Sequence, residues 1–320
     1  MRTFFQLIRF YQLIIIAVCM YALRYFMLEP VLEYFGEGLA MPGCEFGLLV
    51  ISVLLITAGA SIINDYFDRK ADLHNRPERV IVGIHINRRM AIILHSFFSV
   101  LGIIAGWYVA YKAGFFWFGL IFPFITFIFW RYSSLYKYKM LIGNIIMALL
   151  VAGIPFLVFT FEYFFAVKIM GKSIPSDIYH HLMVLSLGFS CAVFLVYLAH
   201  EITKNIKDFR GDYQAGAKTL PIRMGKNAAR TVISLILVFF VLAMVTGWFV
   251  YLTTLDYIQY NTLSMIYVMV FIVLPAAYMA LRIYDVKRKH QLKRFCTGLK
   301  LLIISGVLFT LIIYLNIYTL

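Results

Sequence analysis

Long runs of apolar residues, separated by short polar segments, dominate the hydrophobic pattern of the chain. A helix needs about 20 apolar residues to cross a hydrocarbon core roughly 30 Å thick, and nine runs approach or exceed that length. The pattern therefore predicts an all-α, polytopic bundle of about nine transmembrane helices. The expected spans are residues 10–28, 46–64, 90–111, 115–131, 141–160, 181–201, 228–250, 262–282 and 299–319.

Composition supports the same class of protein. The 320 residues are 63% hydrophobic and 14% charged, whereas soluble chains are about 45–50% apolar and about 25% charged. The four cysteines are scattered and form neither a Cys-x-x-Cys pair nor a disulfide framework. These values exclude soluble, disordered and disulfide-rich classes, and we expect one integral-membrane domain over residues 1–320.

The basic residues predict the orientation of the bundle. With nine spans, the N-terminus and the loops after the even-numbered spans share one side, and all but four of the 29 Lys and Arg residues fall there. The four exceptions are Arg24, Lys112, Lys168 and Lys172. Because basic loops favour the cytoplasmic side, we expect a multi-pass protein of the cell (cytoplasmic) membrane. The net charge of +14 then requires no nucleic-acid partner.

Aspartate is concentrated in two short runs on this side. The first acidic motif, residues 64–72, reads Asn-Asp-Tyr-Phe-Asp-Arg-Lys-Ala-Asp, and the second acidic motif, residues 204–212, reads Lys-Asn-Ile-Lys-Asp-Phe-Arg-Gly-Asp. Both fit the pattern Asp/Asn-x-x-Asp-x-x-x-Asp. Positions i, i+3 and i+7 lie within about 60° on an α-helix. Each motif therefore predicts an acidic stripe at the end of a helix.

Two such stripes facing each other suggest a divalent cation. In a poorly hydrated pocket the carboxylates would repel unless cations lay between them. Mg²⁺ prefers oxygen ligands and commonly joins a few carboxylates to the phosphate oxygens of a substrate. The expected metal-binding and catalytic residues are Asp65, Asp68, Asp72, Asp208 and Asp212. Solvated helix ends with i,i+4 charge pairs are the alternative, but two matching copies on one side favour the metal site.

Taken together, these residues resemble the UbiA superfamily of intramembrane prenyltransferases. The first motif matches that family's N-D-x-x-D-x-x-x-D, and residues 75–79 resemble its N-R-P-x-R loop. The second motif with residues 216–221, Gly-Ala-Lys-Thr-Leu-Pro, resembles K-D-x-x-D-x-x-G-D…G-x-x-T-L-P, although Asn205 stands where many members carry Asp. A third landmark, Y-S…K…G-N, is resembled by Tyr132, Ser133, Lys137, Gly143 and Asn144.

The resemblance implies a central cavity in which a prenyl group passes from an allylic polyprenyl diphosphate to a lipophilic acceptor. Mg²⁺ held by the five Asp residues would act as Lewis acid and template, and the prenyl tail would lie between helices, at the depth of membrane lipid. We expect loops 73–89 and 213–226 to cap the cavity from the cytoplasm. The residues expected to bind the diphosphate are Arg9, Asn64, Arg76, Lys137 and Lys204.

The motifs indicate the acceptor less specifically than they indicate the reaction class. The second motif with its Gly-Ala-Lys-Thr-Leu-Pro tail is most similar to the branch that prenylates geranylgeranylglyceryl phosphate, so an ether-lipid acceptor is expected. An aromatic or quinone precursor, of ubiquinone, menaquinone, tocopherol or chlorophyll type, is the alternative. A divalent-cation transporter is a remote alternative, because transporters usually place such residues at interrupted helices near the bilayer midplane.

Overall fold

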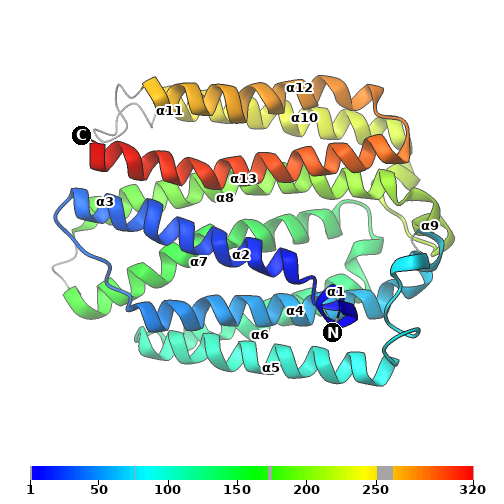
Figure 1. Ribbon diagram of the computed structural model, residues 1–320, viewed down its shortest axis with the longest axis horizontal. Coiled ribbons are helices and arrows are strands. Elements are labelled where there is room, and N and C mark those ends of the chain that lie inside the picture. Colours follow the sequence, from blue (N-terminus) through cyan, green and yellow to red (C-terminus); the bar gives the residue numbers. More distant parts are fainter. Residues whose placement is uncertain (1, 76, 172–174, 251–261, 320) are drawn as a thin grey trace.

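Helices that run side by side make up the protein, and the chain crosses from one end of the bundle to the other with each long helical segment (Figure 1). The computed structural model describes residues 2–75, 77–171, 175–250 and 262–319. Within these ranges nine helical segments are long and apolar enough to cross a membrane. Those that consist of one helix are α4 (Gly43–Asn75), α5 (Arg88–Lys112), α7 (Ile142–Met170), α8 (Ser176–Lys207), α10 (Leu220–Val250) and α13 (Lys289–Thr319).

The other three spans are built from shorter helical pieces. The first joins α2 (Phe10–Leu23) to α3 (Glu29–Tyr34) through a π-helical turn, and the short α1 (Arg2–Leu7) precedes it. The fourth is a 3₁₀ turn followed by α6 (Ile121–Ser134), and the eighth contains α11 (Thr262–Tyr267) and α12 (Leu274–Arg282). A further short helix, α9 (Phe209–Gln214), lies between α8 and α10.

The predicted all-α bundle of nine spans is confirmed, but several helices are longer than predicted. The span expected at residues 46–64 is the 33-residue α4, which begins directly after Pro42 and ends shortly before Pro77. Likewise, α13 begins at Lys289 instead of residue 299. In α10 the backbone leaves the helical conformation at Gly225 (φ 85°), so its continuous part begins close to the predicted residue 228. Hydropathy marks only the part inside the hydrocarbon core, whereas backbone hydrogen bonding carries α4 and α13 on through polar residues.

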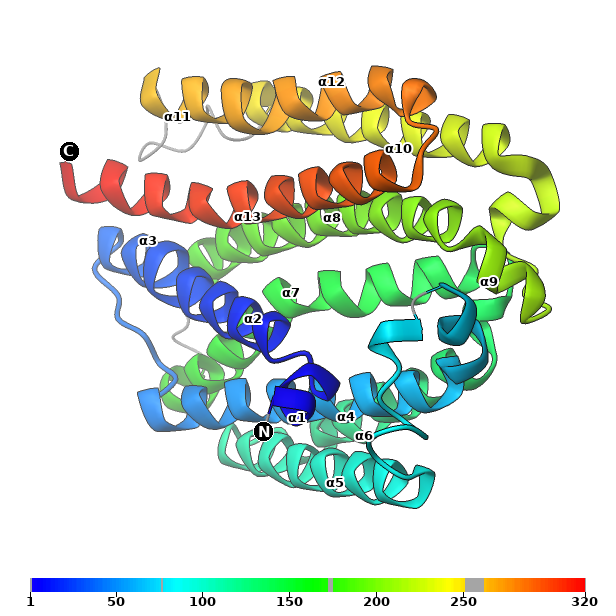
Figure 2. The same cartoon turned by 45° about the vertical axis from the view of Figure 1, so that its right-hand side comes forward.

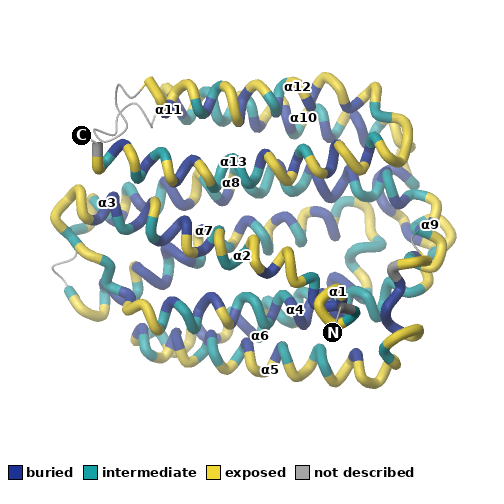
Figure 3. The backbone as a smooth tube through the Cα atoms, in the orientation of Figure 1, coloured by how far each residue is buried: buried dark blue, intermediate teal, exposed yellow. Residues whose placement is uncertain are grey.

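Side chains on the outside of the bundle are largely apolar. Figure 3 shows exposed positions along the outer helices, and these include Trp117 and Leu281, which are 75% and 76% exposed. A contiguous apolar exterior on this scale suits contact with lipid. The chain is therefore a multi-pass integral membrane protein.

A buried polar network fixes the loop that precedes α4. The guanidinium of Arg24 donates a hydrogen bond to the carbonyl oxygen of Met41, and a carboxylate oxygen of Glu162 in α7 accepts from the backbone N–H groups of Ala40 and Met41. Arg24 and Glu162 are 3% and 1% exposed. This network lies at the end of the bundle away from α9 (Figure 1), so it ties the first span, the loop and α7 together there.

Candidate functional site

A cavity of about 2530 Å³ lies between α2, α4, α6, α7, α8 and α13. Pockets for small ligands usually enclose roughly 300–1,000 Å³, so this cavity has room for a long-chain molecule and a second reactant. Apolar side chains such as Ile56, Phe122 and Phe189 line one part, and residues of both acidic motifs line another.

The two acidic motifs meet at one end of the bundle. Figure 2 shows α9 beside the end of α4, and the backbone N–H of Gly211 in α9 donates a hydrogen bond of 3.0 Å to Oδ1 of Asn75 in α4. A Cβ atom at Gly211 would lie 2.7 Å from the carbonyl oxygen of Ala71, so only glycine permits so close an approach. Segments 136 residues apart in the sequence are joined in this way.

In the first motif, basic side chains reach the carboxylates from other helices. Lys137, which follows α6, pairs with Asp68 and donates a hydrogen bond of 3.2 Å to Oδ1 of Asn64. Asn64 in turn donates to Asp68 at 2.8 Å. A nitrogen of Arg9 lies 2.9 Å from Asp65. Arg9 has a φ of 53°, a left-handed conformation that is uncommon for a residue other than glycine and that redirects the chain between α1 and α2.

The second motif does not form the single helical stripe that its spacing predicts. α8 ends at Lys207 and α9 begins at Phe209, so the helix is interrupted at Asp208. The interruption turns the chain toward α4, where Gly211 meets Asn75. Asp208 is 8% exposed and lies 3.8 Å from the ammonium of Lys207.

Asn205 has a hydrogen-bonding partner of its own. Its Nδ2 donates to Oδ1 of Asn144 in α7 at 3.2 Å. A carboxylate at position 205 could not donate this bond. The departure from the resembled family's pattern at this position therefore coincides with an amide–amide contact between α8 and α7.

Electrostatic coupling between the motifs is visible at Asp212, which lies outside the spans. Burial, followed by the negative charges of Asp208 and Asp68, raises the pKa of Asp212 to about 7. Tyr138 is in the same field: burial together with the charges of Asp68, Asp212 and Asp72 raises the pKa of its hydroxyl above the usual value. The carboxylates of both motifs are thus close enough to repel one another.

The donors at this end of the cavity have the chemistry that Mg²⁺ requires. Carboxylate and amide oxygens predominate, and they belong to Asn64, Asp65, Asp68, Asp72, Asp208 and Asp212, all of which line the cavity. Among the described residues, no three His, Cys, Asp or Glu side chains form a metal-binding group by themselves. A site that uses a few carboxylates and completes its shell with substrate phosphate oxygens is the usual arrangement for Mg²⁺, and the residues present fit it.

Nine of the ten residues expected to bind metal or diphosphate line this cavity. Eight have just been described, and the ninth, Lys204, lies 3.4 Å from Glu201. The tenth, Arg76, lies outside the described residues. Parts of both expected caps also line the cavity, through Glu78, Val80, Ile81 and His85 in one and through Ala217 and Thr219 in the other.

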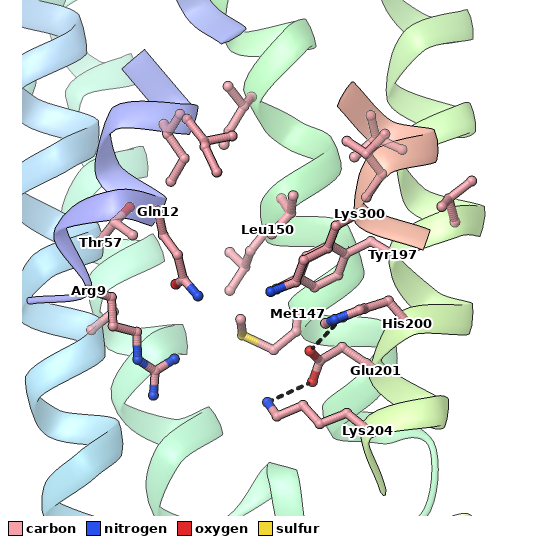
Figure 4. A pocket seen from close by; sticks show the side chains of 18 of the residues that line it. Arg9, Gln12, Thr57, Met147, Leu150, Tyr197, His200, Glu201, Lys204 and Lys300 are labelled. Atoms are coloured by element: carbon pink, nitrogen blue, oxygen red, sulfur yellow. Dashed lines mark hydrogen bonds and ion pairs between the residues drawn. The ribbon is translucent and has the colours of Figure 1, made fainter. Parts of the chain in front are cut away.

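Polar side chains that the sequence did not assign to the site also line this cavity, among them Gln12, His200, Glu201 and Lys300. Figure 4 shows His200, Glu201, Lys204 and Lys300 on one wall, with Arg9 and Gln12 on the opposite wall. Nδ1 of His200 lies 3.4 Å from Glu201. Glu201 in α8 and Lys300 in α13 both lie within segments long and apolar enough to span a membrane, and a charged residue in such a span is itself a sign of function. That sign was available in the sequence.

Known proteins resemble this chain over most of its length. The UbiA prenyltransferase family matches residues 34–316. A digeranylgeranylglyceryl phosphate synthase of Thermococcus gammatolerans is 31% identical over 264 residues, which are 80% of this chain and 83% of that protein. A protein of the same name from Methanothermobacter thermautotrophicus is 30% identical over 243 residues, 75% of this chain and 76% of the other.

Solved structures show the same architecture. A structure described as that of a digeranylgeranylglyceryl phosphate synthase in membranes has a TM-score of 0.62 at 18% identity and covers 97% of this chain and 98% of its own. A UbiA homologue from Archaeoglobus fulgidus, bound to DMAPP and Mg²⁺, has a TM-score of 0.53 at 17% identity, with 96% and 99% covered. At these identities the similarity establishes the fold.

Proposed function

The chain belongs to the UbiA prenyltransferase family, and on that premise we propose that it transfers a prenyl group from an allylic polyprenyl diphosphate to geranylgeranylglyceryl phosphate. The reaction class is that of the family. The choice of acceptor is supported by the two digeranylgeranylglyceryl phosphate synthases compared above, of which this chain covers 83% and 76%.

The observation that carries the proposal is the convergence of two acidic motifs on one end of a cavity that is apolar elsewhere. A polyprenyl diphosphate has the complementary form, a highly charged head on a long hydrocarbon chain. The head fits beside the Asp, Lys and Arg side chains, and the chain fits along the apolar wall formed by residues such as Ile56, Phe122 and Phe189.

Asp65, Asp68, Asp72, Asp208 and Asp212 are the residues that would hold Mg²⁺, with Asn64 in support. When bound, Mg²⁺ neutralises charge on the diphosphate as it leaves. The Archaeoglobus fulgidus homologue, which has the same fold, was solved with Mg²⁺ and a prenyl diphosphate.

Basic side chains would hold the leaving group directly. Lys137 and Arg9 contact the first motif, and Lys204 lines the cavity beside the second. In the reaction the bond between C1 of the prenyl group and the diphosphate oxygen breaks, and its electron pair stays with the diphosphate. The acceptor hydroxyl oxygen bonds to C1, and its proton passes to the departing diphosphate. Lys137, Arg9 and Lys204 stabilise the charge that develops on the leaving oxygens.

The apolar part of the cavity protects the intermediate state. An allylic centre that carries positive charge reacts with water, so a dry wall around C1 favours transfer over hydrolysis. Phe122, Phe129 and Tyr132 in α6 line the cavity, and the faces of aromatic rings also attract a cation.

We assign the end of the bundle that bears the acidic motifs to the cytoplasmic face of the cell membrane. In the sequence, all but four Lys and Arg residues fall in the N-terminus and in the segments between spans on this side, in agreement with the distribution of basic residues in membrane proteins. Mg²⁺ can then reach the acidic motifs directly from the cytoplasm, and the released diphosphate can leave into it.

Purified protein with Mg²⁺, labelled geranylgeranyl diphosphate and a panel of acceptors tests the proposal. We expect release of diphosphate and formation of a doubly prenylated glyceryl phosphate that require both metal and acceptor. Product formed only with an aromatic acid or quinone precursor would refute the proposed acceptor. Metal uptake into liposomes with no product from any acceptor would refute the reaction.

A further inference from the structure

Lys300 places a positive charge deep within the cavity. It belongs to α13 and lies six residues beyond Arg294, which corresponds to about 9 Å along a helix that rises 1.5 Å per residue. Its side chain lines the cavity and points into it (Figure 4). A lysine near a helix end usually extends toward lipid headgroups, but Lys300 faces the interior instead.

The neighbouring cations are already neutralised by carboxylates, whereas Lys300 is not. Arg9 lies 2.9 Å from Asp65, and Lys204 lies 3.4 Å from Glu201. In the described part of the chain, no carboxylate forms an ion pair with Lys300. Instead it lies in the electrostatic field of two further cations, Lys204 and Arg9, and of the carboxylate of Glu201, which pairs with Lys204.

Polar groups surround Lys300 without satisfying its charge. Figure 4 shows Tyr197 and His200 beside it on the α8 wall, and Gln12 of α2 on the facing wall. The side chain of Gln12 is exposed to the cavity and can donate hydrogen bonds from its amide. An anion placed here would meet an ammonium on one side and an amide on the other.

The position of this group relative to the acidic motifs is informative. Along α8, the step from Asp208 to His200 is eight residues, or about 12 Å toward the apolar part of the cavity. A diphosphate head occupies the acidic end, so a second reactant must approach C1 of the prenyl group from this deeper part. An acceptor with its own negative charge needs a separate cation there.

We infer that Lys300, assisted by Gln12, binds the phosphate of the acceptor and thereby selects phosphorylated acceptors, an inference that rests on the proposed function. In a glyceryl phosphate the accepting hydroxyl and the phosphate belong to the same three-carbon unit. Anchoring the phosphate at Lys300 therefore positions the hydroxyl between this subsite and the acidic end, where C1 of the donor lies.

Kinetics with matched acceptors test the inference. The variants are Lys300→Met, Lys300→Arg and, as a control on the same helix but outside the cavity, Arg294→Met. For Lys300→Met we expect KM for geranylgeranylglyceryl phosphate to rise roughly 10- to 100-fold, because the variant loses one charge-assisted hydrogen bond to the phosphate. KM for geranylgeranyl diphosphate and for unphosphorylated geranylgeranylglycerol should not change, and Lys300→Arg should retain most of the wild-type affinity.

Equal rises in KM for both acceptors, or a rise in KM for the donor, would overturn the inference, because Lys300 would then support the cavity or bind the donor. Binding without turnover separates the inference from the proposed function. Without Mg²⁺ and donor, geranylgeranylglyceryl phosphate should raise the melting temperature of the wild type but not that of Lys300→Met. If the wild type binds this lipid but never prenylates it, the proposed function fails and the subsite stands. If the lipid stabilises both proteins equally, the subsite fails.

Discussion

The backbone N–H of Gly211 donates a hydrogen bond of 3.0 Å to the side chain of Asn75. Each residue lies at the edge of one acidic motif, so this contact sets the separation between the two groups of carboxylates. Conservative substitutions of Gly211 or Asn75 can alter this contact, so the effect of the spacing between the motifs can be measured directly.

Gly211→Ala should push the motifs apart. The added Cβ would meet the side chain of Asn75 at 2.4 Å and the carbonyl oxygen of Ala71 at 2.7 Å, and overpacking of this kind costs about 1–3 kcal/mol. We expect a lower melting temperature and a higher Mg²⁺ concentration for half-maximal activity. Gly43→Ala, where nothing lies within 4 Å of the added atom, should change neither quantity. If Gly211→Ala kept the Mg²⁺ dependence of the wild type, the contact between Gly211 and Asn75 would not control the spacing of the carboxylates.

Asp68→Asn and Asp208→Asn should each lower kcat by about 10²- to 10³-fold, the usual effect of removing one electrostatic group from a reaction centre. The amide keeps the size of the side chain, so the melting temperature should fall little. Asp285→Asn is the matched control, because Asp285 pairs with Arg282 on the surface and does not line the cavity. Near-normal turnover by either site variant would remove that residue from the metal site.

Mg²⁺ and diphosphate should bind synergistically. Mg²⁺ sites in proteins usually combine one or two carboxylates with substrate phosphate oxygens and waters, and we expect the carboxylates at this end of the cavity to share the metal with the diphosphate in this way. We expect Mg²⁺ alone to raise the melting temperature slightly, and Mg²⁺ with a non-reactive prenyl thiodiphosphate to raise it strongly. A ligand at roughly 100 times its Kd stabilises by about 2.7 kcal/mol. Full stabilisation by Mg²⁺ alone would contradict a shared site.

The contact between Asn205 and Asn144 should be structural. A double-mutant cycle of Asn205→Ala and Asn144→Ala should give a coupling energy of about 1 kcal/mol, as expected for one buried hydrogen bond. Both single variants should keep the wild-type Mg²⁺ requirement. If Asn205→Ala alone raised the Mg²⁺ concentration needed for activity, Asn205 would be a ligand.

The network at the other end of the bundle should affect stability without affecting chemistry. Glu162→Gln removes the charge that faces Arg24 and weakens the bonds to Ala40 and Met41. We expect a loss of about 1.5–3 kcal/mol, typical of hydrogen bonds to a charged group, with unchanged KM values below the unfolding temperature. The exposed Asp177→Asn is the control. Altered KM for the donor would mean that this loop reaches the site.

The nine spans and the shared face of the two motifs could be predicted from the sequence, because hydropathy and basic loops report position relative to the membrane directly. The ends of the helices could not be predicted, because hydropathy does not identify polar residues that continue a helix. α4, for example, continues to Asn75, since nothing before Pro77 interrupts it. The turn at Asp208 was also missed, since it depends on the contact between Gly211 and Asn75, which are distant in sequence.

The site residues that could be predicted are those in local sequence motifs, and those that could not be predicted are brought to the site by helix packing. Asp65, Asp68 and Lys137 were found because they belong to recognisable local patterns, and the structure brings them to one cavity. Glu201 and Lys300 belong to no recognisable motif, and only the packing of α8 against α13 brings them to one cavity. Periodicity cannot show which face of a span looks inward when almost every position is hydrophobic.

The length of α4 determines where in the bilayer the reaction takes place. Its 33 residues extend about 50 Å, against a hydrocarbon thickness of roughly 30 Å. α4 is therefore longer than the hydrocarbon core is thick, so the polar end that carries Asp68 and Asp72 can extend beyond the hydrocarbon while the apolar part of the cavity stays within it. A polyprenyl diphosphate in a bilayer has its charged head at the membrane surface and its hydrocarbon chain among the acyl chains. It can therefore enter the cavity without moving either part into an unfavourable environment.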